Sequence, residues 1–143
     1  MILYLDTSAF IKLYIVEEGR KEVLRAARIA ESVASNEIAY VEMRAALARL
    51  ARTNRLESGR LARVKKAFEE DWTGTLRVLP DEPMVKRSGD LAERFGLRGY
   101  DSLHLAAAER LMSESAWEVR FACFDRALGR AAHALGLGAL SAV

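Results

Sequence analysis

The first ten residues constrain the fold more than any other segment of the chain. Residues 2–5 form a continuous apolar run of strand-forming side chains, typical of a strand buried on both faces of a parallel sheet. Asp6 ends the run, and Thr7 or Ser8 can then cap a helix expected over residues 8–16. Ligands bind at the carboxyl ends of parallel strands, so Asp6 is a candidate ligand-binding residue. The alternative is that Asp6 only helps to cap the helix.

The same order of strand, aspartate and helix returns near the end of the chain. A strand expected over residues 119–124 leads to Asp125, and a helix is expected from there to about residue 135, before Gly136. Strands and helices alternate between these two segments. Further strands are expected at 32–35, 75–79 and 139–143, and further helices at 20–30, 36–52, 57–73, from Pro83 to 95, and from Asp101 onward. This alternation predicts a three-layer α/β/α sandwich with a central parallel sheet, as a single domain over residues 1–143.

The composition excludes several classes of protein. The chain has 143 residues, of which 51% are hydrophobic and 29% charged, as in an ordinary globular domain. No apolar run approaches the length of a membrane span and no basic region precedes a signal core, so we expect a cytoplasmic protein that is not bound to a membrane. Cys123 is the only cysteine, which rules out an internal disulfide and a zinc–thiolate site.

Positive charge is concentrated in one segment, although the net charge is only +2. Residues 44–66 carry eight basic side chains and one acid, so this segment has a charge of +7 and the rest of the chain −5. The eight are Arg44, Arg49, Arg52, Arg55, Arg60, Arg63, Lys65 and Lys66. Such a segment favours an anionic partner such as nucleic acid, with Arg44 and Arg49 as the first candidates for phosphate contacts. The alternative is an ordinary solvated helical face.

Two more acids are candidates for the edge of the sheet at which Asp6 is expected. Glu42 lies in the predicted helix 36–52, on a mainly apolar face, where an inward-pointing carboxylate must be paired or bound to metal. The alternative is an exposed helical glutamate. Asp101 follows a glycine loop and is expected to cap the next helix. His104, one turn later, is a weak metal ligand candidate, because a single histidine is more often structural.

Four carboxylates would then converge, since Asp6 and Asp125 share one edge of the sheet and Glu42 and Asp101 lie on helices that can reach it. Without cationic partners the four would repel one another. A hard divalent cation, Mg²⁺ or Mn²⁺, relieves this repulsion and prefers carboxylate oxygens. One or two such ions could activate water and stabilise the leaving oxygen of a phosphodiester.

At the level of motifs, the chain resembles a PIN-domain ribonuclease of the VapC type, a toxin of bacterial and archaeal toxin–antitoxin pairs. The resemblance covers essentially the whole chain. It is carried by Tyr4-Leu5-Asp6-Thr7-Ser8-Ala9, by Ser35 with Val41-Glu42, by Tyr100-Asp101-Ser102-Leu103-His104, and by Phe124-Asp125 with Leu135-Gly136-Leu137. The segment around Asp101 is the most specific of these. Cys123 departs from the family, which often has threonine at this position. This puts in doubt the hydrogen bond that would support Asp125, but not Asp125 itself.

The resemblance implies a metal-dependent endoribonuclease that cleaves RNA as the toxin of such a pair. It assigns the metal to Asp6, Glu42, Asp101 and Asp125, with the Ser8 hydroxyl in support. It also implies an antitoxin whose C-terminal segment wraps the apolar helices, and frequent homodimers. The helix at residues 8–16 is apolar on two faces, and Phe68 and Trp72 add apolar surface on the helix 57–73, so a groove between these helices is a candidate antitoxin site. The alternative is that these apolar faces are core, covered by the sheet and by a second subunit.

Two other classes of protein are compatible with an aspartate after the first strand. A haloacid-dehalogenase-type phosphatase needs a second aspartate two residues later, where this chain has Ser8. A response-regulator receiver needs paired acids near the first strand and a lysine after a late strand, and neither is found. A catalytically silent PIN-like binding module is the third alternative, and the presence of all four acids argues against it.

Overall fold

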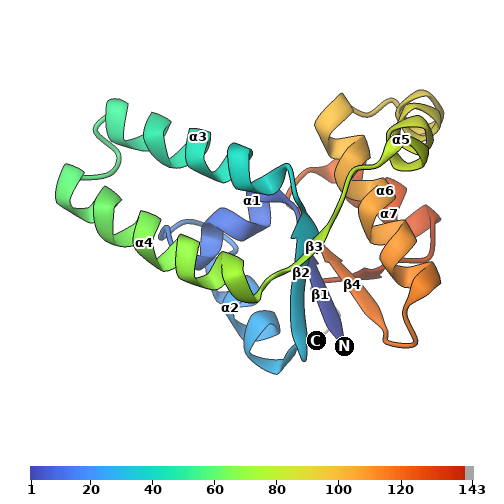
Figure 1. Cartoon of the computed structure of the whole chain (residues 1–143), viewed down its shortest axis with the longest axis horizontal. Helices are drawn as coiled ribbons and strands as arrows, with labels where there is room; N and C mark the ends of the chain where they lie inside the picture. Colours follow the sequence, from blue (N-terminus) through green and yellow to red (C-terminus); the bar gives the residue numbers. More distant parts are fainter. Residues whose placement is uncertain (141–143) are drawn as a thin grey trace.

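The computed structural model describes residues 1–140, apart from the side chain of Ser58, and its centre is a five-stranded sheet (Figure 1). The strand order is β3-β2-β1-β4-β5, and every neighbouring pair is parallel. The strands are β1 (Ile2–Leu5), β2 (Ser32–Asn36), β3 (Leu76–Val78), β4 (Val119–Ala122) and β5 (Gly138–Ala139). The predicted parallel sheet is confirmed. The last strand begins one residue earlier than expected, and the expectation for residues 141–143 lies outside the described residues.

Helices cover both faces of the sheet, as the sandwich prediction requires (Figure 1). The helices are α1 (Thr7–Phe10), the 3₁₀ helix η1 (Ile11–Leu13), α2 (Arg20–Ile29), α3 (Ala39–Arg52), α4 (Ser58–Gly74), α5 (Glu82–Phe95), α6 (Gly99–Glu114) and α7 (Arg126–Ala134). Strand β1 is buried along its whole length, and its side chains alternate between two cores. Ile2 and Tyr4 pack with α5, α6 and α7, whereas Leu3 and Leu5 pack with α1 to α4. None of the described helices is both long and apolar enough to cross a membrane.

Helices α3 and α4 form an antiparallel hairpin that extends away from the sheet (Figure 1). Phe68 of α4 is fully buried at its base, with the rings of Phe10, Tyr40 and Trp72 at centroid distances of 5.5, 5.8 and 5.7 Å. Phe68 and Trp72 were expected to be either core or partner surface. They are core residues, because Phe10 of the first helix packs directly against both.

The order of the strands determines where a ligand can bind. The chain moves outward from β1 through β2 to β3 and then crosses to the other side of β1 to form β4. Ligands of open α/β sheets bind in the crevice outside the carboxyl ends of the strands at such a reversal. Leu5 pairs with Ala122 at this end, and the Asp6 amide donates to the Ala122 carbonyl at 3.1 Å. Asp6 and Asp125 therefore leave neighbouring strands at the same edge.

The first helix is shorter than the prediction for residues 8–16. The α-helix ends at Phe10, and a single 3₁₀ turn carries the chain to Leu13. The apolar positions were correctly identified, but they lie on two short segments instead of one regular helix. Phe10 and Tyr14 are buried, whereas Ile11 and Ile15 are only half-buried.

Candidate active site

Asp6 caps a helix, one of the two roles that the sequence left open, and its part in ligand binding stays a prediction. It caps α1, since its Oδ1 accepts hydrogen bonds from the Ala9 amide at 2.9 Å and from the Ser8 hydroxyl at 2.7 Å. The expectation that Thr7 or Ser8 would be the cap is wrong, because the chain already turns into the helix at Thr7. Asp6 is only 3% exposed, and this burial raises the pKa of its carboxyl, against the opposing effects of His104 and the two hydrogen bonds.

Asp125 caps α7 in the same way, with its Oδ1 accepting from the Leu128 amide at 2.9 Å. The Ser8 hydroxyl joins the two aspartate loops, because it donates to Asp6 and accepts from the Phe124 amide at 3.2 Å. Cys123 places its sulfur 3.7 Å from the Asp125 carbonyl oxygen. Burial raises the pKa of the Cys123 thiol to about 12, so it is a weak neutral donor to the backbone.

Asp101 has a cationic partner that the sequence analysis did not anticipate. Helix α6 begins at Gly99 with Arg98 at its cap, so Asp101 lies within the first turn and the expectation that it would be the cap is wrong. The Arg98 guanidinium donates to Asp101 Oδ2 at 2.9 Å and lies 3.8 Å from Asp125 Oδ2. The assumption of four acids without a cation is therefore corrected. The Arg98 side chain is 80% exposed, so solvent and salt weaken these ion pairs.

These groups surround one cavity of about 270 Å³ at the carboxyl edge of the sheet. It is lined by Asp6, Thr7, Ser8, Arg98, Asp101, His104, Phe124 and Asp125. The donor set fits a hard divalent cation, since three carboxylates face one space and the charge of Asp101 adds to the cost of ionising Asp6. The types of side chain fit a cation, but their positions do not yet form a binding site. Within residues 1–140, no three potential ligands are close enough together to hold an ion.

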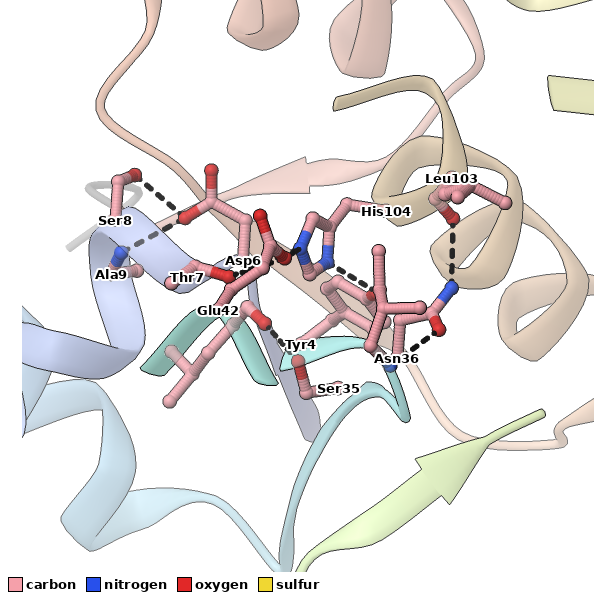
Figure 2. A network of polar contacts seen from close by, with 12 residues as sticks. Tyr4, Asp6, Thr7, Ser8, Ala9, Ser35, Asn36, Glu42, Leu103 and His104 are labelled. Carbon is pink, nitrogen blue, oxygen red and sulfur yellow. Dashed lines mark hydrogen bonds and ion pairs between the residues drawn. The ribbon is translucent and has the colours of Figure 1, made fainter. Parts of the chain in front are cut away.

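Glu42 lies beside this cavity and is held by two other side chains (Figure 2). Its Oε1 accepts from the Thr7 hydroxyl at 2.7 Å and lies 2.8 Å from His104 Nε2. Burial opposes ionisation of Glu42, but the hydrogen bonds from His104 and Thr7 bring the pKa of its carboxyl below the ordinary value. The prediction that an inward-pointing Glu42 must be paired is confirmed. Glu42 is not among the residues that line the cavity.

The end of β2 positions both helices that carry these acids. The buried Asn36 accepts from the Ile38 amide at 3.1 Å, just before α3, and donates to the Leu103 carbonyl of α6 at 3.2 Å (Figure 2). Helix α3 itself begins three residues after Asn36, at Ala39. The neighbouring Ser35 donates to the Leu5 carbonyl at 2.7 Å and so fixes β2 against β1.

Thr7, Arg98 and His104 are the site residues that the sequence analysis missed or gave little weight. No sequence pattern links Thr7 to Glu42, because the two lie 35 residues apart along the chain. Arg98 lies only three residues before Asp101, its closer partner, so this spacing was an available signal, whereas Asp125 is 27 residues away. For His104 the available signal was its place inside an apolar helical face, three residues after Asp101. The interpretation of His104 as a buried structural residue agrees with its 2% exposure.

The two arginines expected to contact phosphates have different surroundings. Arg44 donates to Glu69 at 2.9 Å and to the Tyr40 hydroxyl at 2.6 Å, so its guanidinium bridges α3 to α4. Arg49 is exposed, two helical turns after Glu42, and therefore lies on the same side of α3. RNA contact by either arginine remains a prediction, and the geometry favours Arg49.

The fold and the acidic cavity agree with a comparison of the chain with known families. Residues 3–134 match the PIN-domain family, so the chain belongs to that family, as the motif resemblance predicted. This membership sets aside the phosphatase and receiver alternatives. PIN-domain nucleases generally depend on a divalent metal ion.

Two similar proteins refine this assignment. They are named Ribonuclease VapC45 and Ribonuclease VapC49, and they come from two strains of Mycobacterium tuberculosis. Each is 34% identical to this chain over 135 residues, which covers 94% of this chain and 92% of the relative. The predicted resemblance to VapC-type ribonucleases is therefore confirmed at the level of sequence similarity.

Proposed function

We propose that this protein is a divalent-metal-dependent endoribonuclease that hydrolyses RNA phosphodiester bonds as the toxin of a toxin–antitoxin pair. One observation carries the proposal: Asp6, Asp101 and Asp125 face a single cavity at the reversal of strand order, in a chain of the PIN-domain family. The names of the two relatives support ribonuclease activity. Such a toxin would act in the cytoplasm, on cellular RNA.

Asp6, Asp101 and Asp125 would hold the cation, with Glu42 joining them from α3. A bound Mg²⁺ or Mn²⁺ supplies deprotonated water at neutral pH and neutralises charge on the phosphate. Ser8 keeps Asp6 Oδ1 occupied, so the carboxylate is oriented before the cation arrives. Arg98 is placed to exchange its contact with Asp101 for a contact with the RNA phosphate, because arginine pairs well with both groups.

Removal of the metal tests the chemistry. Purified protein without antitoxin should cleave total RNA in Mn²⁺ or Mg²⁺, lose cleavage in excess chelator, and recover it when the ion is restored. Mapping the RNA ends would identify the target. Cleavage that persists in chelator would contradict the metal-based mechanism. Binding of RNA without any cleavage, in either ion, would instead support the silent PIN-like module.

The basic side of α3 gives a second test. Arg49 lies about 10 Å along α3 from Glu42, within reach of a phosphate a few nucleotides from the cleaved bond. Arg49→Gln should weaken RNA binding and reduce the salt slope by about one, since one phosphate contact is lost. Arg28→Gln, on the exposed side of α2, is the matched control. An unchanged salt slope for Arg49→Gln would mean that Arg49 makes no phosphate contact and lies on an ordinary solvated helical face.

A protein antitoxin and a second copy of the chain are the proposed partners. A groove of about 570 Å³ between η1, α2 and the end of α4 suits an antitoxin helix, because Phe10, Leu13 and Tyr14 form its apolar wall while Glu70 and Asp71 supply negative charge. A second groove, of about 530 Å³, adjoins Asp101 between α5 and α6 and has exposed Val85 and Tyr100 at its walls. That surface suits a homodimer contact.

A further inference from the structure

A chain of hydrogen bonds runs from the buried core to Glu42 (Figure 2). The Tyr4 hydroxyl of β1 lies 2.9 Å from His104 Nδ1, and His104 Nε2 of α6 lies 2.8 Å from Glu42 Oε1 of α3. Tyr4 is fully buried and His104 is 2% exposed, so the bond between them is shielded from water, whereas Glu42 at the other end is 26% exposed. Three elements that are distant in sequence thus meet through one imidazole ring.

The acceptor character of the carboxylate fixes the proton positions in this chain. An ionised carboxylate can only accept, so the Nε2 atom of His104 that faces Glu42 must carry hydrogen. In the neutral ring, Nδ1 is then a bare acceptor, and the Tyr4 hydroxyl donates to it. The phenol therefore selects the tautomer that lets His104 donate to Glu42.

The same oxygen of Glu42 receives a second donor, the Thr7 hydroxyl, at 2.7 Å. Thr7 Oγ1 and His104 Nε2 are themselves 3.3 Å apart, so the two donors and Oε1 form a compact group. Within residues 1–140, Oε2 of Glu42 makes no such hydrogen bond, and Figure 2 shows it turned away from His104. Thr7 and His104 both line the cavity that the three aspartates face.

We propose that His104 is a positioning residue. Together with Thr7 it anchors Oε1 of Glu42, which leaves Oε2 as the oxygen that binds the cation. Tyr4 holds the imidazole in the tautomer that donates to Glu42. The inference rests on the proposed metal-dependent function and adds a role for three residues outside the set of proposed metal ligands. Partners that orient a metal ligand in this way commonly change metal affinity ten- to a hundredfold when they are replaced.

Two variants of His104 separate positioning from packing. In His104→Gln the side-chain amide reaches the place of Nε2 and keeps a donor for Glu42; in His104→Asn the shorter amide occupies the place of Nδ1 and keeps only a partner for Tyr4. Both lose the ring and its edge-on contact with Tyr4, so a packing role would affect both equally. We expect the Mn²⁺ affinity measured by calorimetry to fall about tenfold in His104→Asn, and to be largely preserved in His104→Gln.

The cleavage rate constant should follow metal affinity at low Mn²⁺ and recover at saturating Mn²⁺. In a Glu42→Gln background the difference between the two variants should vanish, because the carboxylate they act on is gone. Equal loss of Mn²⁺ affinity in both variants, or no loss in either, would overturn the inference. A wild-type protein that neither binds Mn²⁺ nor cleaves RNA would instead overturn the proposed function itself.

A third variant keeps the test decisive if both substitutions at His104 unfold the protein. Tyr4→Phe removes only the hydroxyl that selects the tautomer and keeps the ring. Nitrogen-15 NMR of the His104 imidazole should report a single tautomer with hydrogen on Nε2 in the wild type and a mixture in Tyr4→Phe, with weaker Mn²⁺ binding. A wild-type ring with hydrogen on Nδ1, or a ring unchanged by Tyr4→Phe, would contradict the assignment.

Discussion

Asp6→Asn should lower the rate of RNA cleavage by on the order of a hundredfold or more, while the protein remains folded. Asp6 is the most buried of the three carboxylates around the cavity, and its Oδ1 is already occupied by Ser8 and Ala9. Asparagine keeps an acceptor for both of these donors but offers the cation no negative charge. Initial cleavage rates at saturating Mn²⁺ measure the effect, with Asp90→Asn on the exposed side of α5 as the matched control.

The same substitution should not destabilise the metal-free protein at neutral pH. Burial raises the pKa of Asp6 above its ordinary value of 3.8, so the folded protein favours the protonated form. Ionisation therefore costs folding free energy, a cost that is absent below pH 3.8 and develops as the pH rises through the raised pKa of the folded state. Denaturant titrations should find Asp6→Asn at least as stable as the wild type at pH 7, with the difference vanishing under acid conditions. Cleavage at the wild-type rate would remove Asp6 from the proposed site.

Phe68→Ala should lower the free energy of unfolding by about 3–5 kcal/mol, a large share of the roughly 5–15 kcal/mol typical of a domain. Phe68 is fully buried, and aromatic rings from the first helical segment, α3 and its own helix surround it. Truncation leaves a cavity that these rings can fill only in part, because they are attached to different elements. Chemical denaturation followed by fluorescence of the adjacent Trp72 measures the loss.

Trp117→Ala is the matched control for this prediction, since Trp117 is 56% exposed in the loop before β4. Its effect should stay within about 0.5 kcal/mol, as for most surface substitutions. A loss below about 1 kcal/mol in Phe68→Ala would mean that the α3–α4 hairpin is not fixed to the sheet by this aromatic cluster. The groove proposed for the antitoxin would then lack a rigid wall.

Local patterns were enough to predict the layered architecture of this protein. The apolar run before Asp6 specifies a buried parallel strand, because a strand covered on both faces has no polar side to alternate with, and the strand before Asp125 is apolar apart from Arg120. Helix α5 ends at Phe95, as expected, and Gly96 follows it in a left-handed conformation with φ of 65°. These features depend on neighbours within a few residues, which is why sequence alone determines them.

The site itself was predictable only in part. An aspartate that follows a parallel strand must emerge at the carboxyl edge of the sheet, so the meeting of Asp6 and Asp125 follows from the strand–helix alternation. The neutralising contact of Arg98 did not follow, because Asp101 could equally have been the helix cap that the glycine loop suggested. Because α6 begins at Gly99, before Asp101, the Asp101 carboxylate pairs with Arg98 instead of capping the helix.

Sequence by itself determined that this chain forms a parallel α/β sandwich with acids at one edge, since periodicity and strand ends encode both. Only the tertiary structure decided how those acids are held. Tyr4, Thr7, Glu42 and His104 form one hydrogen-bonded group across separations of up to 100 residues, and the partly exposed Arg44 is paired with Glu69 of α4. Such pairings depend on the packing of α3 and α6 around β1. A shift of about 1 Å between donor and acceptor is enough to break a hydrogen bond, and sequence patterns do not specify positions that finely.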